Sequence, residues 1–509
     1  MTSVAPPCPD ARETDRYSDV PSPDPARRGC PRWARWLVLA ALVAVGCAVR
    51  WHVISYETSD YRVFLSQWYQ TLDTQGFGAF KQQFADYNYP YLYLIWLLTV
   101  VHAPSLIGIK ALSMVFDLVL AIVAYRIVAL RTDRFALRAL AFGIIFLLPS
   151  VIANSAWWGQ ADAIYSALAL GGVYLLLRAQ RDGLSHRAYV VNSLWACVLF
   201  GASLSFKLQA VFVLPVLAWL VLRGRLPWYA LAAIPAVFVA AVVPAVIAGA
   251  PWSDALSVYA NQTGSYKQLT LGAANLYQLI PIAGDVTWLA HLGIGLAAAV
   301  VAAFLAWSVW KKPAVTPTSI VVVATASAVI VPFLLPAMHD RYFYLAEILS
   351  VVAAFYLPLR FVFIPLLIQA AAIGVYHSSL SGDQGHSFGH GMPGGGRGIG
   401  DANHTGVQAN PGAGSAPGGG TPGNRGQFGG PPGGVGNRGA GAGHGGWGRA
   451  GGRGDTGGYS SGRGDTALSI YATMMGLAAL GVVYAVADTF RRARHAITPH
   501  RTATSDAST

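Results

Sequence analysis

The chain has 509 residues, of which 54% are hydrophobic and only 11% are charged, and its formal net charge is +12. Several apolar runs reach the roughly 20 residues that a helix needs to cross a bilayer, which excludes a soluble globular protein. The basic residues are scattered through short loops and the two ends, so they indicate membrane topology rather than a nucleic-acid surface. The four cysteines show neither a CxxC motif nor zinc-ligand spacing, so neither a disulfide framework nor a zinc site is expected.

The chain begins with a polar, Pro-rich stretch, residues 1–36, that ends in an arginine cluster. This composition predicts a disordered tail, and the positive-inside rule places it in the cytoplasm. The apolar run from Trp36 to Ile54 lacks a convincing cleavage site, so we interpret it as a membrane-spanning anchor and not as a signal peptide. Residues 56–106 would then lie outside.

We expect an all-α polytopic membrane protein, with a transmembrane domain over residues 37–379 and a bundle of about 12 spans in total. The run 91–101 is short and opens with aromatic residues, which favours an interfacial helix in the first external segment. With that assignment every arginine cluster falls on the cytoplasmic side. After the first span, the others are expected at 107–125, 136–156, 163–177, 188–205, 208–222, 228–249, 288–310, 318–336, 345–358, 361–378 and 467–490.

The segment 380–466 is dominated by Gly, with Pro, Asn, Ser and Arg. Because such a composition cannot bury a core, we expect a disordered loop on the outer face. The last span, 467–490, follows it, and residues 491–509 should form a second cytoplasmic tail.

Asp60 is the first candidate for chemistry, because it follows directly on the first apolar run. Carboxylates at a membrane surface, in a chain so poor in charge, mark functional positions. If its segment is helical, Asp60 shares a face with Gln67 and Trp68, as in a sugar site. Alternatively, Asp60 only caps this helix. Further candidates in the same segment are Glu57, Asp86 and Tyr87.

Trp158, Gln160 and Asp162 form a second candidate group, between two apolar runs. Paired tryptophans at the interface are often only an aromatic belt, and Asp162 could cap the next helix. A belt and a cap would not need the intervening Gly159 and Gln160, which favours a role in substrate binding.

Lys207 is the lone basic residue of a predicted external hairpin, where the positive-inside rule disfavours a cation. A bound phosphate would explain it, and so would a side chain that extends to the interface. Gln209, two residues further on, is a second candidate for contact with the substrate.

The densest polar cluster between two spans is a predicted external turn that contains His339, Asp340, Arg341 and Tyr342. Arginine with histidine suits a phosphate leaving group, although a structural ion pair would also account for the cluster. Asn275 is a weaker candidate, since it could simply cap the next helix.

The order of these groups resembles the GT-C superfamily of membrane glycosyltransferases, over most of residues 37–378 and 467–490. The first external segment is similar to that of dolichyl-phosphate-glucose-dependent transferases, and later motifs resemble bacterial relatives. The chain departs from the family at Tyr91, where a second proline is frequent, and at Leu208, where many bacterial members have proline. The residues that carry the resemblance are Asp60, Tyr61, Gln67, Trp68, Asp86, Tyr87, Trp158, Gly159, Gln160, Asp162, Lys207, Gln209, His339, Asp340 and Arg341.

The resemblance implies transfer of a hexose, mannose or glucose, from a polyprenyl-phosphate donor to a glycan, lipid or protein acceptor of the cell envelope. The site would face outward from a bacterial plasma membrane. The sequence indicates no firm cofactor and does not decide whether a divalent metal takes part. A lipid-phosphate leaving group departs already ionised, whereas the attacking hydroxyl must lose its proton to a carboxylate. Asp60 would be that base, and Asp162 is the second catalytic candidate.

The same mechanism gives the basic side chains a role. Lys207, His339 and Arg341 would neutralise the departing phosphate, and the aromatic and amide groups would hold the sugar rings. Attack opposite the phosphate would invert the anomeric carbon.

Two other classes of protein fit the same composition. A transporter or flippase of lipid-linked sugars would also be helical, but it should show internal repeats with broken helices near the midplane, and the sequence has no such repeat. A non-catalytic envelope scaffold, with the Gly-rich loop as its working part, would leave the clusters around Asp60 and His339 without a role.

The positive-inside assignment predicts that both termini and Arg181 are cytoplasmic and that Gly420 is external. In a chain freed of its native cysteines, a membrane-impermeant maleimide applied to intact cells should label a cysteine at position 420. It should not label one at position 181. The opposite pattern would invert the topology.

Overall fold

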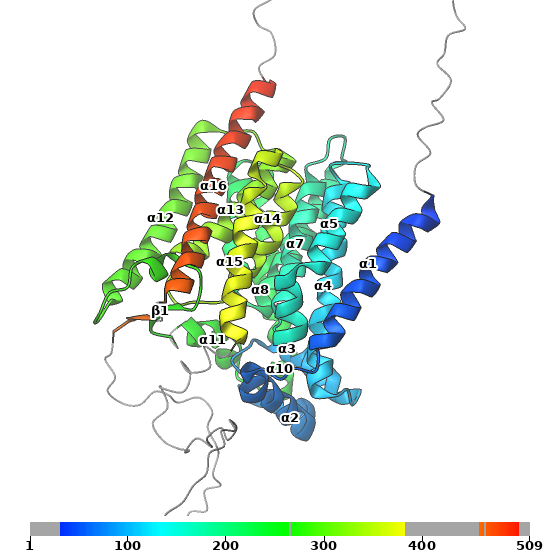
Figure 1. Ribbon diagram of the computed structural model, residues 1–509, viewed down its shortest axis with the longest axis vertical. Coiled ribbons are helices and arrows are strands. Elements are labelled where there is room, and N and C mark those ends of the chain that lie inside the picture. Colours follow the sequence, from blue (N-terminus) through cyan, green and yellow to red (C-terminus); the bar gives the residue numbers. More distant parts are fainter. Residues whose placement is uncertain (1–30, 264–265, 382–457, 463–464, 498–509) are drawn as a thin grey trace, which may run out of the picture. The chain divides into compact units, whose positions relative to one another are not determined.

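The structure is a computed structural model that describes residues 31–263, 266–381, 458–462 and 465–497. Within these ranges, long helices alternate with short helical turns (Figure 1). The α-helices are α1 Arg32–Val53, α2 Ser66–Gln75, α3 Tyr89–Val100, α4 Ser105–Ala129, α5 Phe135–Leu147, α6 Pro149–Ile152, α7 Asp162–Ala179, α8 His186–Phe206, α9 Pro215–Leu222, α10 Ala233–Ala248, α11 Trp252–Thr263, α12 Thr287–Lys311, α13 Pro317–Leu334, α14 Tyr344–Ala354, α15 Phe363–Leu380 and α16 Thr466–Ile497.

The remaining helical segments are single turns of two kinds. The π-helical turns are Tyr61–Leu65 and Ala153–Trp158, and the 3₁₀ turns are Gly76–Lys81, Leu208–Val213, Trp228–Ala232, Leu276–Leu279 and Leu359–Phe361. Most of the Gly-rich segment 380–466 and of the two expected tails lies outside the described residues. At their edges, α1 begins at Arg32, four residues before Trp36, and α16 runs from Thr466 to Ile497, which is one residue before the expected start and seven residues beyond the expected end of the last span.

Nine of the described helices are long and apolar enough to cross a membrane, and the bent pair Phe135–Leu147 and Pro149–Trp158 is a tenth candidate. The chain is therefore an all-α, multi-pass membrane protein, but the expected set of about 12 spans is not confirmed. Residues 208–222 form a 3₁₀ turn and an eight-residue helix, and α14 has only 11 residues. Apolar composition predicted spans there because it does not distinguish a span from a short helix buried inside the bundle.

The expected span 136–156 is broken between α5 and α6. The two parts are bent by 42°, and the second part starts at Pro149. Proline has no amide hydrogen, and its ring disfavours a helical conformation of the residue before it. The break redirects the chain into the π-helical turn that precedes α7.

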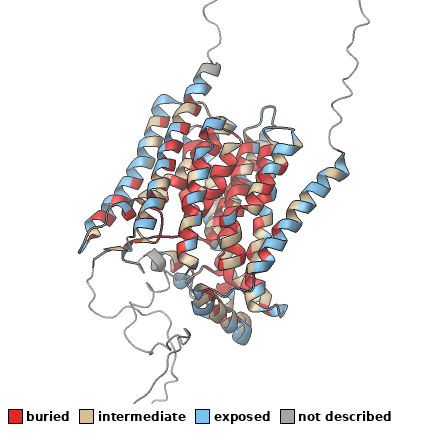
Figure 2. Ribbon diagram, in the orientation of Figure 1, coloured by how far each residue is buried: buried red, intermediate tan, exposed pale blue. Residues whose placement is uncertain are grey.

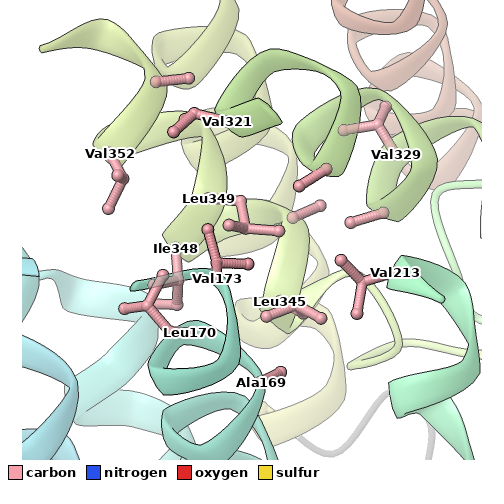
Figure 3. Close-up of a cluster of buried hydrophobic side chains, with 14 of the residues drawn as sticks. Ala169, Leu170, Val173, Val213, Val321, Val329, Leu345, Ile348, Leu349 and Val352 are labelled. Atoms are coloured by element: carbon pink, nitrogen blue, oxygen red, sulfur yellow. The ribbon is translucent and has the colours of Figure 1, made fainter. Parts of the chain in front are cut away.

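Buried residues concentrate on the interior helices, whereas α1 and α12 expose most of their surface (Figure 2). In the core, Leu345, Ile348 and Leu349 of α14 lie against Leu170 and Val173 of α7 (Figure 3). Lipid tails are as apolar as leucine, so close packing stabilises these contacts more than exclusion from water does.

A three-stranded parallel sheet lies among the connections between helices. It consists of β1 Gln268–Leu271, β2 Met338–His339 and β3 Ser460–Gly462, in the order β2-β1-β3. Thr270 of β1 lies opposite both Met338 and Gly462. The sequence did not predict these strands, and β3 corrects part of the segment expected to be disordered. Residues 340 and 341 follow β2 directly, so the sheet fixes the position of the backbone that carries their side chains.

A buried ion pair joins the first helix to the rest of the bundle. Arg50 of α1 donates through Nε and Nη2 to Oδ2 of Asp117 on α4, at 3.1 and 2.8 Å, and both side chains are fully buried. The guanidinium also donates to the carbonyls of Gly46 and Phe146. The hydroxyl of Ser155, on the π-helical turn before α7, donates to the same Oδ2 at 2.5 Å. One carboxylate oxygen therefore connects α1, α4 and that turn.

Replacing Arg50 alone should destabilise the protein strongly. Arg50→Met leaves the Asp117 carboxylate buried without its counter-charge, and breaking a buried pair in this way costs about 3–5 kcal/mol. The midpoint of thermal unfolding in detergent should fall in Arg50→Met, and it should recover largely in the double variant Arg50→Met/Asp117→Leu. Arg32→Met, which removes an exposed arginine of the same helix, should unfold like the wild type. An equal loss in the single and double variants would contradict this account.

Candidate active site

The candidate site lies where α7 begins and α8 ends, and Asp162 is its centre. Asp162 is fully buried, yet its carboxylate has partners from three parts of the chain. Lys207 Nζ pairs with Oδ1, Asn154 Nδ2 donates to Oδ2 at 2.9 Å, and Arg341 Nε lies 3.9 Å from Oδ2. A buried carboxylate requires such compensation. The alternative in which Asp162 only caps α7 is wrong, because the start of α7 has no side-chain capping bond.

Lys207 follows the last residue of α8 in an extended conformation, with φ −155° and ψ 135°. Its side chain is nearly buried, and Nζ lies 5.3 Å from the centroid of the Tyr87 ring as well as on Asp162. Trp68 packs against the same Tyr87 ring, with the centroids 5.3 Å apart. The buried ion pair therefore explains Lys207, whose side chain does not extend into solvent.

Asp60 reaches the same site from the segment between α1 and α2. Its Oδ2 accepts hydrogen bonds from Trp158 Nε1 at 3.0 Å and Gln160 Nε2 at 2.6 Å, and lies 3.5 Å from Arg341 Nη1. No described residue donates to Oδ1, and 21% of the side chain is exposed. One oxygen of this carboxylate is therefore held by the protein, and the other is free to meet a substrate.

Asp60 does not cap the helix that follows it. Its side chain makes no capping hydrogen bond, and the amide of Tyr61 instead donates to Thr58 Oγ1 at 3.3 Å. The expected shared face is also wrong, because residues 61–65 are π-helical and their side chains are out of phase with an α-helix. The buried side of this segment contains Tyr61, Leu65 and Trp68, and no contact among the described residues joins the Gln67 side chain to the site.

Trp158 and Gln160 are positioned by hydrogen bonds to their backbone. Thr58 Oγ1 donates to the Trp158 carbonyl at 3.1 Å, and Ser113 Oγ donates to the Gln160 carbonyl at 2.7 Å. Between them, Gly159 has φ +83°, a conformation that glycine adopts without the cost that a Cβ brings. Hydrogen bonds from α4 and from the segment after α1 therefore hold the two residues that donate to Asp60. The interpretation of this turn as only an aromatic belt does not account for these contacts.

Arg341 lies between three carboxylates. Nη1 is 3.5 Å from Asp60 and 3.6 Å from Asp340, and Nε is 3.9 Å from Asp162. These separations exceed the roughly 2.7–2.9 Å of a strong charge-assisted hydrogen bond. Nε is buried and has no hydrogen-bond partner among the described residues. The guanidinium is therefore surrounded by charge but retains donors for a ligand.

Asp340 supports the backbone at this position. Its Oδ1 accepts the amide of Arg341 at 2.9 Å, and its Oδ2 accepts the hydroxyl of Ser379 at 2.8 Å. Burial raises the pKa of Asp340 to about 6, against the opposing effects of the Arg341 charge and of the Ser379 hydrogen bond. Asp340 thus holds the turn that presents Arg341.

His339 packs between two tyrosine rings, with centroid distances of 4.7 Å to Tyr266 and 5.1 Å to Tyr342. Burial and, after it, the charges of Arg341 and Lys207 lower its pKa to about 3. His339 is therefore neutral at physiological pH, and the expectation that it neutralises a phosphate charge is wrong. It can still donate one hydrogen bond.

Two other predicted residues lie towards solvent. Glu57 is exposed and pairs with Arg62 across 3.7 Å on the surface. Asp86 is exposed at the rim of the site, where its charge adds to burial in raising the pKa of the Tyr266 hydroxyl.

Asn275 and Gln209 are buried, and within the described residues neither side chain forms a hydrogen bond with Asp60, Asp162 or Arg341. Asn275 makes no capping bond, and its Nδ2 instead donates to the carbonyls of Leu269 and Leu335, at 3.4 Å each. It therefore joins β1 to the end of α13. Gln209 follows Lys207, but its Oε1 has no hydrogen-bond partner in the described chain.

Several residues of the site were missed. Asn154, a ligand of Asp162, was hidden in the expected span 136–156, although a polar amide inside an apolar run is itself a functional signal. Tyr266 and Ser379 contact the His339 turn from distant segments, and no local pattern marked them. The hydroxyls of Thr58 and Ser113 act on backbone carbonyls, which a sequence motif does not reveal.

No family model matches the chain, and no curated protein and no solved structure is significantly similar to it. The function must therefore be inferred from the geometry of the site. The site offers an accessible carboxylate oxygen, a guanidinium with an unused donor, a neutral imidazole and aromatic rings. These groups can accept a proton, bind an anion and stack against a sugar.

The neutral state of His339 predicts a pH dependence of stability. Its pKa is about 6.5 in the unfolded chain and about 3 in the folded chain, so between these values the unfolded chain binds more protons. The contribution of His339 is therefore complete above about pH 6.5 and is lost as the pH falls towards 3. The variant His339→Gln lacks it.

We expect the midpoint of thermal unfolding of the wild type, relative to His339→Gln, to rise between pH 4 and 6.5 and then to level off. The raised pKa of Asp340 has the opposite effect between about pH 4 and 6, but Asp340 is present in both proteins and largely cancels in the comparison. A difference that does not vary over this range would show that His339 titrates normally.

Proposed function

We propose that this chain is an inverting glycosyltransferase that moves a hexose from a polyprenyl-phosphate donor to an acceptor hydroxyl of the cell envelope, on the outer face of the membrane. The observation that carries the proposal is the arrangement at Asp60. One oxygen is held by Trp158 and Gln160, and the other receives no hydrogen bond from the described residues.

The free Oδ1 of Asp60 is suited to act as a general base. In the proposed reaction the acceptor hydroxyl attacks the anomeric carbon, its proton passes to Asp60, and the bond between the anomeric carbon and the phosphate oxygen breaks. The lipid phosphate takes the electron pair of that bond and needs no proton to depart. Fixing Oδ2 orients the carboxylate in advance, which lowers the entropic cost of reaching the reactive geometry.

Arg341 is the side chain best suited to bind the departing phosphate. Its side chain makes only long contacts with carboxylates, and its buried Nε has no partner among the described residues. A buried donor without an acceptor costs about 1–3 kcal/mol, and a phosphate oxygen would remove that cost. Lys207 is less available, because Asp162 already binds its ammonium group.

Asp162 has a positioning role in this proposal. It is fully buried and receives Lys207 and Asn154, so it is poorly placed to accept a proton from substrate. The aromatic side chains of Trp158 and Tyr87 border the same region and suit the apolar faces of a sugar ring. The resemblance of the motif order to the GT-C superfamily supports the same reaction class.

The variant Asp60→Asn tests whether Asp60 acts as a general base or is only a structural carboxylate. Asparagine keeps the shape and can still accept hydrogen bonds from Trp158 and Gln160, but it cannot take up the proton of the acceptor. Loss of a general base lowers the rate by about 10²–10⁴-fold. We therefore expect normal insertion and folding, with transfer of a radiolabelled hexose from a polyprenyl-phosphate donor reduced by that factor.

The matched control is Asp73→Asn, which removes an exposed carboxylate from α2 and should transfer at the wild-type rate. Donor binding, measured separately, should persist in Asp60→Asn. Turnover near the wild-type rate in Asp60→Asn would rule out Asp60 as the base.

A further inference from the structure

A groove of about 590 Å³ lies between α7 and α8, at the ends of these helices away from Asp162. Arg178 at the end of α7 and Arg187 near the start of α8 line it, together with Val191 and Trp195 of α8. Arg178 lies 16 residues after Asp162 on α7, about 24 Å at 1.5 Å per residue. At its other end the groove reaches Leu199, eight residues or about 12 Å before Lys207 of the candidate active site. It is a separate feature of the molecule.

One face of α8 forms most of the groove wall. Arg187, Val191, Trp195 and Leu199 all line it and are four residues apart, a spacing that places them along one ridge of a helix. The stripe is about 18 Å long, close to the thickness of one leaflet, which is about half of a 30 Å hydrocarbon core. Its charged residue lies at one end, and the rest is apolar.

The charges at the mouth of the groove are not compensated. Neither Arg178 nor Arg187 forms an ion pair in the part of the chain that the structure describes, and Arg178 only packs near the Tyr174 ring, 5.8 Å from its centroid. Other loop arginines do find carboxylates, as Arg138 does with Asp133 and Arg360 with Asp488.

We propose that this groove binds an anionic phospholipid of the bilayer. The two guanidinium groups bind the lipid phosphate, an anion for which arginine has matching geometry. An acyl chain lies along Val191, Trp195 and Leu199. The exposed fraction of Trp195 is 56% and that of Val191 is 44%, so this apolar wall is open to a lipid chain.

The test uses the full-length protein in a neutral detergent and measures lipid binding by native mass spectrometry. We expect phosphatidylglycerol to bind well and phosphatidylcholine poorly. Each arginine near an anionic lipid contributes a factor of about five in affinity. Arg178→Gln/Arg187→Gln should therefore bind phosphatidylglycerol about 30-fold more weakly than the wild type.

Two further comparisons between variants distinguish a specific lipid-binding site from general charge attraction. Arg134→Gln/Arg181→Gln removes the same charge from loop arginines outside the groove lining and should leave binding within about twofold of the wild type. Val191→Trp fills the groove without changing charge and should weaken binding, whereas Leu194→Trp, on a neighbouring exposed face of α8, should not.

Three results would overturn the proposal. Equal binding of the two phospholipids, or equal loss in the two double variants, would show charge attraction without a site. Displacement of the lipid by inorganic phosphate, with no effect of Val191→Trp, would indicate a site for free phosphate. Tighter binding of a polyprenyl phosphate through the same residues would identify the lipid carrier as the occupant. The wild-type comparisons test the proposal even if a variant fails to fold.

Discussion

The burial of Asp162 is the constraint on which the site depends. An ionised carboxylate inside an apolar bundle needs counter-charge and hydrogen bonds, or its desolvation would favour another arrangement. The chain meets that need with Lys207 at the end of α8 and Asn154 on the π-helical turn before α7. These partners fix two helix ends against each other. With Ser113 and Thr58, they set the position of the turn that presents donors to Asp60.

Much of the candidate site was predictable, because a charge in an apolar chain is costly and therefore rare. That argument selected Asp60 and Arg341, whereas the positive-inside rule selected Lys207 and the preceding Gly-Gln pair selected Asp162. The structure brings all four together. These arguments could not assign their partners. Lys207 looked available for a phosphate because the sequence does not show that α8 ends beside the start of α7. His339 looked like a cation because its burial between Tyr266 and Tyr342 comes from segments far apart in the chain.

The fold class, an all-α membrane protein, was predictable from the sequence, but the number of membrane spans was less so. Hydropathy identifies helices that can lie among lipid or among other helices, but it does not distinguish the two environments. Apart from Tyr344, Glu347 and Ser350, α14 is apolar, and it is buried inside the bundle along almost its whole length. There composition predicted a span. The small parallel sheet was missed for a different reason. Its strands have two to four residues each, which is too few for an alternating pattern to be visible.

The ion pair between Arg50 and Asp117 has a consequence for biogenesis. Arg50 is the nineteenth residue of α1, and its carboxylate partner lies 67 residues later, on α4. During synthesis α1 therefore enters the membrane before its counter-charge exists, and it must keep the guanidinium at the lipid–water boundary by extending the side chain. Only when α4 arrives can Arg50 move into the protein interior. The final seating of the first helix is thus a late event, and mistakes in inserting α4 would leave α1 loosely attached.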